Sequence, residues 1–199
     1  MIYLYYEFSI NNKVLQYKIW NLVIQKLYWN GQGKALDIGT GAGALAIELA
    51  KKFPDSFIIG IDYWGILWNY SKHKCEKNAK IEGVANQVAF QKASASKLPF
   101  EDCEFDAIIS NFVYHEIRDA KDKKSLIKES FRVLKKGGVF SLQDIFKSKK
   151  KFGEIEELIR EIKKWGIKEV GFIESTIHIP MPNLLKFELK KMGLIYGVK

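Results

Sequence analysis

The spacing of apolar positions changes along the chain, and the changes predict alternating helices and strands. In residues 12–29 apolar side chains recur at three- and four-residue intervals, which is the period of an amphipathic helix. After the turn NGQGK, short apolar runs alternate with longer helical patterns. We expect strands at residues 35–39, 57–62, 88–94, 105–112, 138–146, 167–175 and 194–199, and helices at 12–29, 42–53, 65–82, 121–135 and 153–164.

This alternation predicts an α/β fold. Strands that alternate with helices form a doubly wound, mostly parallel sheet with helices on both faces, here with seven strands. A chain of 199 residues is the size of one domain with one sizeable core, and no repeat, low-complexity segment or linker divides it. The first helix admits three interpretations: it packs on the domain, covers a ligand as a lid, or lies on a membrane surface.

Composition and charge narrow the class of protein. Hydrophobic residues make up 47% of the chain and charged residues 28%, which is typical of a globular protein rather than a disordered one. No secretory signal or membrane-spanning run is visible, and Cys75 and Cys103 are isolated, so we expect a cytoplasmic protein without a disulfide framework or a metal site.

The net charge of +9 fits nucleic acid, an anionic membrane surface or acidic substrates. The lysines are spread along the chain, however, which favours a solvated surface. The densest run, Lys147 and Lys149–Lys151, is expected in a loop.

The stretch DIGTGAG places Asp37, Gly39, Gly41 and Gly43 at the end of the first strand of the sheet. Doubly wound sheets bind their ligands outside the carboxyl ends of the strands, and glycines let a backbone turn sharply or approach a ligand. The GxGxG spacing differs from the GxGxxG of dinucleotide binding, and no lysine follows as in a phosphate-binding loop. The Asp37 carboxylate would repel a pyrophosphate but suits a ligand with an ammonium or sulfonium group.

A second carboxylate follows at the end of the next strand. Asp62 comes about twenty residues after the loop, where an acidic side chain accepts hydrogen bonds from ribose hydroxyls. Each such charge-assisted bond is worth ~1.5–3 kcal/mol. The sequence therefore predicts a ligand that contains a ribose.

Four motifs in order now resemble a known family. DIGTGAG, IIGIDYW, FQKASASKLPFEDCEFDAIISNFVYHEI and RVLKKGGVFSLQD look like the motifs of class I S-adenosylmethionine-dependent methyltransferases. The nearest resemblance is to the type 11 branch, which includes the ubiquinone/menaquinone methyltransferases, and it covers roughly residues 33–145. It implies a Rossmann-like methyltransferase fold with an N-terminal helical lid (1–32), a cofactor-binding core (33–145) and a C-terminal helix with strands (146–199).

The resemblance also implies roles for individual residues. Asp62 should hold the ribose of S-adenosylmethionine, and Tyr63 should lie against the adenine. Asn111 and Phe112 should lie beside the methyl group. The methionine part should be held by Asp37 and by the loop residues Gly39, Thr40, Gly41 and Gly43.

One position departs from the family pattern. Ser94, followed by Ala95, stands where the family usually has an Asp-Ala pair whose carboxylate reaches the adenine amino group. We expect weaker adenine anchoring, through water or through the Ala95 amide, and tighter binding after Ser94→Asp.

The resemblance implies methyl transfer by in-line displacement, in which orientation alone contributes ~7–11 kcal/mol. A base is needed only if the acceptor loses a proton. His115 is the candidate base, with packing beside the pocket as the alternative, and Glu116 is a second candidate. NFVY lacks the prolines of the [DNS]PP[YFW] motif, which disfavours exocyclic DNA amino groups as acceptors.

The acceptor is left open by the core motifs, because these address only the cofactor. We expect a small-molecule acceptor, with contact to a membrane surface or a second copy of the chain as further possibilities. A non-catalytic nucleic-acid- or membrane-binding protein and a dinucleotide-dependent oxidoreductase are the alternatives. Aromatic side chains that line an acceptor pocket, or instead belong to the core, are Tyr3, Tyr5, Tyr6, Tyr17, Trp20, Phe146, Phe152 and Trp165.

Overall fold

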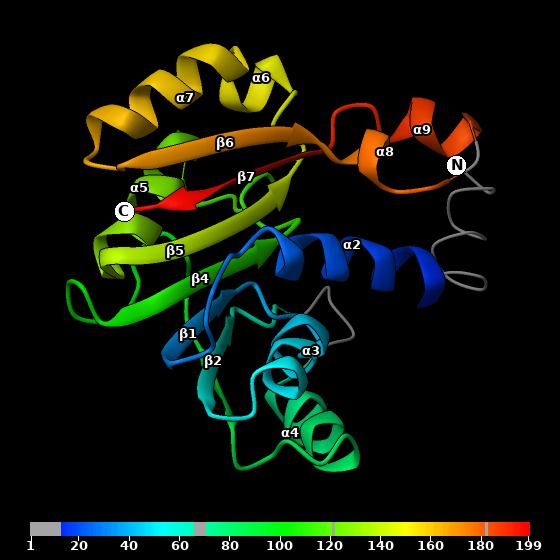
Figure 1. Cartoon of the computed structure of the whole chain (residues 1–199), viewed down its shortest axis with the longest axis vertical. Helices are drawn as coiled ribbons and strands as arrows, with labels where there is room; N and C mark the ends of the chain where they lie inside the picture. Colours follow the sequence, from blue (N-terminus) through cyan, green and yellow to red (C-terminus); the bar gives the residue numbers. More distant parts are fainter. Residues whose placement is uncertain (1–12, 66–70, 121, 182) are drawn as a thin grey trace.

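A seven-stranded sheet forms the centre of the computed structural model, which describes residues 13–65, 71–120, 122–181 and 183–199 (Figure 1). The strand order is β3-β2-β1-β4-β5-β7-β6. The strands are β1 (Gly33–Ile38), β2 (Ser56–Asp62), β3 (Val88–Lys92), β4 (Phe105–Asn111), β5 (Leu134–Asp144), β6 (Glu169–Glu174) and β7 (Gly193–Val198).

The first five strands pair in parallel, as the sequence predicts, whereas β7 runs antiparallel to both β5 and β6. The chain passes from β1 outward to β2 and β3 and then returns to place β4 on the other side of β1. The switch point of the sheet therefore lies between the carboxyl ends of β1 and β4, which is where such sheets bind ligands.

Helices cover both faces of the sheet, and each face has its own core (Figure 1). The period of two along β1 sends Ala35 into one core and Leu36 into the other. The first core includes side chains of α2 (Lys13–Gln25), α3 (Ala44–Lys52) and α4 (Lys72–Ile81). The second includes side chains of α5 (Lys123–Val133), α6 (Lys149–Phe152) and α7 (Ile155–Lys164).

The helix α2 is part of the first core. Its Leu15, Ile19 and Val23 side chains are buried there, whereas Val14 and Tyr17 face solvent with 61% and 48% of their surface exposed. The packing interpretation of this helix therefore holds for the described residues, and a role as a lid stays a prediction. No helix in the described part of the chain is long and apolar enough to cross a membrane.

The predicted helix at residues 65–82 is too long at its start. The structure begins α4 at Lys72, because the Ser71 hydroxyl accepts a hydrogen bond from the Lys74 amide and caps the helix. Gly65 lies outside this helix, and residues 66–70, which include Trp68, lie outside the described residues.

Short elements in the second half of the chain also differ from the prediction. Lys149–Lys151 belong to the one-turn helix α6 rather than to a loop, whereas Lys147 lies in the turn before it, as predicted. The helices α8 (Ser175–His178) and α9 (Asn183–Glu188) are not visible in the hydrophobic pattern. The strand expected at 138–146 begins at Leu134, so that Gly138 lies within β5. A side chain on Gly138 would meet Leu134 and the backbone of the neighbouring strand, where the pairing of β4 and β5 shifts register.

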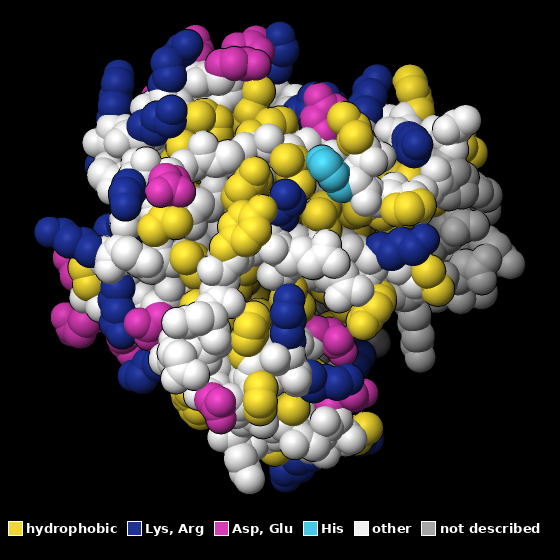
Figure 2. All heavy atoms as spheres, in the orientation of Figure 1, with side chains coloured by type: hydrophobic (Ala, Val, Ile, Leu, Met, Phe, Trp, Pro, Cys, Tyr) yellow, Lys and Arg dark blue, Asp and Glu magenta, His cyan; other side chains and the backbone are white. Residues whose placement is uncertain are grey.

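The basic side chains on one face of the molecule are dispersed. On the face shown in Figure 2, Lys and Arg side chains alternate with acidic ones and with apolar patches. Such a distribution is typical of a solvated surface rather than of a nucleic-acid-binding face.

Candidate active site

The glycine loop (residues 39–43) lies directly against the end of β2. The amides of Gly39 and Thr40 both donate to the Ile61 carbonyl, at 2.8 and 2.9 Å. Gly39, Gly41 and Gly43 have φ values of 74°, 58° and 85°, a region that side chains disfavour. A Cβ on Gly39 would collide with Val113. The turn thus requires the three glycines, and Gly39 is also required by its close packing against Val113, which follows β4.

Asp62 ties this loop to β2. Its Oδ2 accepts a hydrogen bond from the Gly41 amide at 2.9 Å, and its Oδ1 accepts one from the Trp64 amide at 2.8 Å. The Trp64 indole donates back to the Gly41 carbonyl at 2.9 Å. Both polar groups of the Gly41 backbone are therefore bound by residues at the end of β2. A carboxylate has about four lone-pair sites, so Asp62 retains acceptor capacity for a ribose.

Three buried acceptors around the switch point have no hydrogen-bond partner among the described residues. They are Asp37 Oδ2, Thr40 Oγ1 and Asn111 Oδ1. Asp37 is 1% exposed, and burial raises the pKa of its carboxyl to about 7. The nearby Thr40 hydroxyl lowers this pKa, and the charge of Asp62 raises it. An ammonium group supplies three donors and a compensating charge. The residues present therefore fit the amino-acid end of S-adenosylmethionine.

Tyr63, Ser94 and Ala95 follow β2 and β3. Tyr63 is 66% exposed, and the Lys92 ammonium lies 5.2 Å from its ring centroid. Ala95 is buried, and Ser94 follows Ala93, whose amide donates to the Asp62 carbonyl at 3.0 Å. Ser94 therefore follows the residue that is bound to the end of β2, and its expected role toward adenine stays a prediction.

Asn111 ends β4, and Phe112 follows it with a φ of 58°. The Phe112 amide donates to the Gln143 carbonyl at 2.8 Å, which fixes this turn to β5. The Phe112 ring lies edge-on to the ring of His115, with 6.2 Å between the centroids. Asn111, Phe112 and the candidate base His115 therefore lie at and directly after the end of β4.

His115 is held by a carboxylate that sequence reasoning missed. Its Nδ1 lies 2.6 Å from Oδ1 of Asp144, which ends β5 and is fully buried. Burial opposes the charged form of His115, but the hydrogen bond and charge of Asp144 outweigh it and raise the pKa of the imidazole. Glu116, 3.2 Å from Nε2, acts in the same direction, and Lys151, which donates to the His115 carbonyl, acts against it.

This pair has the geometry of an oriented base. The buried Asp144 fixes the ring and favours a proton on Nδ1, which leaves Nε2 for proton transfer. The predicted strand runs on to residue 146, so the sequence did not mark Asp144 as the end of a strand in the way that it marked Asp62.

Several aromatic candidates for an acceptor pocket belong elsewhere. Phe146 and Phe152 are fully buried in the second core and stack edge-on at 5.0 Å, so they do not line a pocket. Trp165 packs against the core residue Phe131, with 6.3 Å between the ring centroids. Tyr3, Tyr5 and Tyr6 lie outside the described residues.

The Cys75 thiol is buried and held in its neutral form. Burial raises the pKa of the Cys75 thiol to about 12, and its sulfur donates to the Gly41 carbonyl at 3.2 Å. In the described part of the chain, no group of three or more His, Cys, Asp and Glu side chains is arranged to hold a metal ion.

Comparison with known sequences identifies relatives of this chain. Residues 36–142 match the family described as "Methyltransferase domain". The chain is 34% identical over 137 residues to the ubiquinone/menaquinone biosynthesis C-methyltransferase UbiE of Geotalea daltonii, covering 66% of this chain and 55% of the relative. It is 32% identical over 111 residues to the sterol 24-C-methyltransferase erg6 of Aspergillus fumigatus, covering 56% of this chain and 27% of that one. The chain spans about half the length of the first of these relatives, and less of the second.

Solved structures share the fold at low sequence identity. The geranyl diphosphate C-methyltransferase of Streptomyces coelicolor, in complex with S-adenosyl-L-homocysteine, superposes with a TM-score of 0.70 at 13% identity, covering 92% of this chain and 79% of that one. The [4+2]-cyclase SpnF superposes with a TM-score of 0.66 at 19% identity, covering 90% of this chain and 79% of that one. The fold alone therefore does not specify methyl transfer, and the site must carry the functional argument.

Proposed function

Because the chain belongs to the methyltransferase domain family, we propose that it transfers the methyl group of S-adenosylmethionine to a small-molecule acceptor. The observation that carries this proposal is the pair of buried oxygens at the switch point that have no hydrogen-bond partner among the described residues, Asp37 Oδ2 and Asn111 Oδ1, beside the carboxylate of Asp62. A cationic ligand with a ribose supplies donors to both parts of this arrangement. A pyrophosphate-bearing dinucleotide would instead place negative charge against Asp37.

The chain's own residues bind and orient in this proposal. Asp37 receives the ammonium group, and Asp62 accepts from the ribose hydroxyls while it holds the loop. Asn111 and Phe112 form the wall between the cofactor and the acceptor. When bound, S-adenosylmethionine supplies a methyl group already activated on a sulfonium, so the protein has to align the acceptor and exclude water.

His115 removes the acceptor proton in this proposal. Asp144 holds its ring by Nδ1, so that Nε2 takes the proton, and the resulting imidazolium is stabilised by Asp144. Because Glu116 lies 3.2 Å from Nε2, its side chain has to turn away when an acceptor reaches the imidazole. Glu116 is 53% exposed at its side chain, which leaves it room to do so.

The acceptor we favour is lipophilic. The named relatives act on quinones and sterols, and a structural neighbour acts on geranyl diphosphate. Within this chain, α8 and α9 carry exposed Ile177, Leu184 and Phe187, at 73%, 54% and 66% exposure. Exposed basic side chains lie on and after α9, and the Lys190 ammonium lies 4.2 Å from the Phe187 ring centroid.

Apolar side chains combined with lysines favour contact with an anionic membrane surface, where such an acceptor would be dissolved. Flotation with phosphatidylcholine vesicles that contain phosphatidylglycerol tests this contact. Ile177→Ser with Phe187→Ser should release the protein, whereas Ile81→Ser, which removes an apolar side chain of similar exposure on α4, should not. Equal flotation of the two variants would contradict the membrane contact.

Calorimetric titration tests the cofactor. We expect micromolar binding of S-adenosylmethionine and S-adenosylhomocysteine, and no heat with NAD or NADP. Binding of a dinucleotide would support the oxidoreductase. Absence of all binding by the folded chain would favour a non-catalytic protein on this fold. That a second copy of the chain completes the acceptor site stays a prediction. Size-exclusion chromatography with light scattering would show whether the chain forms a dimer.

A further inference from the structure

Two serine hydroxyls between β3 and β4 hold a carboxylate from the loop between β4 and α5. Asp119 Oδ2 accepts hydrogen bonds from Ser96 Oγ at 2.6 Å and from Ser94 Oγ at 3.1 Å. The two hydroxyls also lie 2.8 Å from each other. The Ser96 bond lowers the pKa of Asp119, and the Ser94 bond adds to this, so the carboxylate is charged at neutral pH.

This cluster lies beside Asp62 on the side away from the glycine loop. The strand order is β3-β2-β1, with the glycine loop after β1, Asp62 after β2 and Ser94 after β3. A nucleoside whose ribose is held by Asp62 carries its 5′ substituent on one side and its base on the other. If the 5′ substituent lies at the glycine loop, the base extends toward Ser94 and Asp119.

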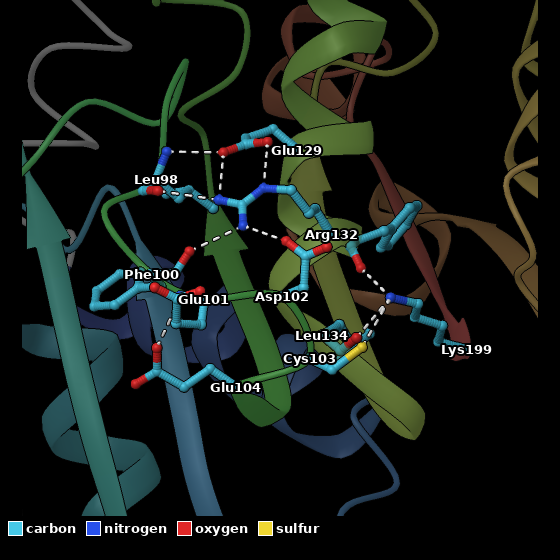
Figure 3. A network of polar contacts seen from close by, with 11 residues as sticks. Leu98, Phe100, Glu101, Asp102, Cys103, Glu104, Glu129, Arg132, Leu134 and Lys199 are labelled. Carbon is cyan, nitrogen blue, oxygen red and sulfur yellow. Dashed lines mark hydrogen bonds and ion pairs between the residues drawn. The ribbon is translucent and has the colours of Figure 1, made fainter.

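Both loops of the cluster are anchored to α5 and its neighbours. The Leu98 amide donates to Glu129 at 2.9 Å, and the Leu98 carbonyl accepts from Arg132 at 3.0 Å (Figure 3). Arg132 also binds the Phe100 carbonyl, which fixes the chain downstream of Ser96. On the other loop, the Lys123 ammonium donates to the carbonyls of Ile117 and Ala120. The loop that carries Asp119 and the loop that carries Ser94 and Ser96 are therefore both fixed in place.

Apolar side chains lie around this cluster. Ala95 and Leu98 are buried in the second core, at 8% and 3% exposure, so they support the loop rather than face a ligand. Ile117 and Ala120 pack against the same core and are only partly buried, so they supply the apolar surface near the carboxylate. An apolar surface with a polar acceptor at its edge suits a flat aromatic base.

We propose that Asp119, oriented by Ser94 and Ser96, accepts a hydrogen bond from the exocyclic amino group of adenine. The carboxylate that reads the base thus comes from the loop after β4 rather than from position 94. This inference rests on the proposed function, because it takes the ligand to be S-adenosylmethionine. Since a carboxylate only accepts hydrogen bonds, it selects an amino group and repels a 6-oxo group.

Replacing the amino group of the ligand tests this recognition. Titration calorimetry with S-adenosylhomocysteine and S-inosylhomocysteine gives the preference for the amino group over the oxo group. For the unmodified chain we expect about a ten- to hundredfold preference, the size of one charge-assisted hydrogen bond. Asp119→Asn should reduce it to about one, because an amide can donate to the oxo group or accept from the amino group.

Asp122→Asn is the matched control. It removes the same charge from the same loop and leaves a side chain that still caps α5, where Asp122 accepts from the Lys124 amide. This variant should keep the full preference. Equal loss of preference in both variants, or an unchanged preference after Asp119→Asn, would overturn the role of Asp119.

Ser94→Asp separates this proposal from the expectation drawn from sequence. With Asp119 in place, a second carboxylate within hydrogen-bond distance should weaken S-adenosylhomocysteine binding, whereas sequence alone predicts tightening. In the Asp119→Asn background, the same substitution should restore the preference for the amino group. Tighter binding in the unmodified background would show that Asp119 only joins the two loops.

The failure of the premise is distinguishable. If the unmodified chain binds neither ligand, the proposed function is wrong and the Asp119 assignment falls with it. If it binds S-adenosylhomocysteine with no preference over the inosine analogue, the proposed function stands and this inference alone is wrong. Ser96→Ala, which removes the 2.6 Å bond and keeps the carboxylate, should lower the preference without unfolding the chain.

Discussion

The buried carboxyl of Asp37 makes ligand binding depend on pH. Burial raises its pKa to about 7, and no donor reaches Oδ2 from the described residues. At pH 6 about nine-tenths of this carboxyl is protonated, and at pH 8 about nine-tenths is ionised. If the ligand ammonium requires the ionised form, the Kd for S-adenosylhomocysteine should be about tenfold higher at pH 6 than at pH 8. This corresponds to a loss of ~1.4 kcal/mol in binding free energy.

The same group changes the free energy of unfolding in the opposite direction. Its pKa in the folded chain lies above the unfolded value of 3.8, so protons favour the folded state. The contribution is complete below about pH 4 and is lost as the pH rises through about 7, and a shift of about three units corresponds to ~4 kcal/mol. The ligand-free chain should therefore become more stable at pH 5 than at pH 8 after other contributions are subtracted.

Calorimetry at pH 6, 7 and 8 and constant ionic strength measures the binding effect, and urea unfolding measures the stability effect. Asp37→Asn separates Asp37 from other titrating groups such as His115. This variant should bind weakly with little pH dependence, and should lose the additional acid stability. A wild-type Kd that is equal at pH 6 and 8, or an Asn variant that keeps the tenfold change, would refute the reasoning.

Three further predictions concern Gly39 in the glycine loop, Asp62 at the end of β2, and the hydrogen-bonded pair of His115 and Asp144. Gly39→Ala should lower the free energy of unfolding by ~1–3 kcal/mol, because φ is 74° and the added methyl collides with Val113; an unchanged urea midpoint would contradict this. Asp62→Ala should abolish calorimetric binding of S-adenosylhomocysteine while the circular dichroism spectrum is retained, and wild-type affinity would remove the ribose assignment. Asp144→Asn should lower the pKa of His115 in an NMR titration, because a buried negative charge is lost, and an unchanged titration would show that the pair is not coupled.

The fold was predictable because the hydrophobic pattern reports burial. The strands from β1 to β5 are apolar runs, since a parallel sheet is covered on both faces. The short helices α6, α8 and α9 were missed because four to six residues give too little periodicity. The prediction misplaced the boundary between α5 and β5, because the chain changes from helix to strand at Leu134 without a break.

The placement of the candidate residues was predictable where a residue lies near the end of a strand. Asp37, Asp62 and Asn111 lie at one edge of the sheet because β1, β2 and β4 are parallel. Their roles toward a cofactor stay predictions. Asp119 lies in a loop twenty-five residues from Ser94, and only the tertiary fold brings the two together. The cytoplasmic location stays a prediction.

The position of β7 has a consequence for the order in which the chain folds. Among the described strands β6 pairs only with β7, although it precedes β7 in the sequence. During synthesis, residues 169–174 therefore emerge from the ribosome before residues 193–198, which form their partner strand. Until then β5 is an open sheet edge, and such edges attract strands of other chains. The helices α8 and α9, which separate the two strands, thus determine how long a newly made molecule exposes this edge.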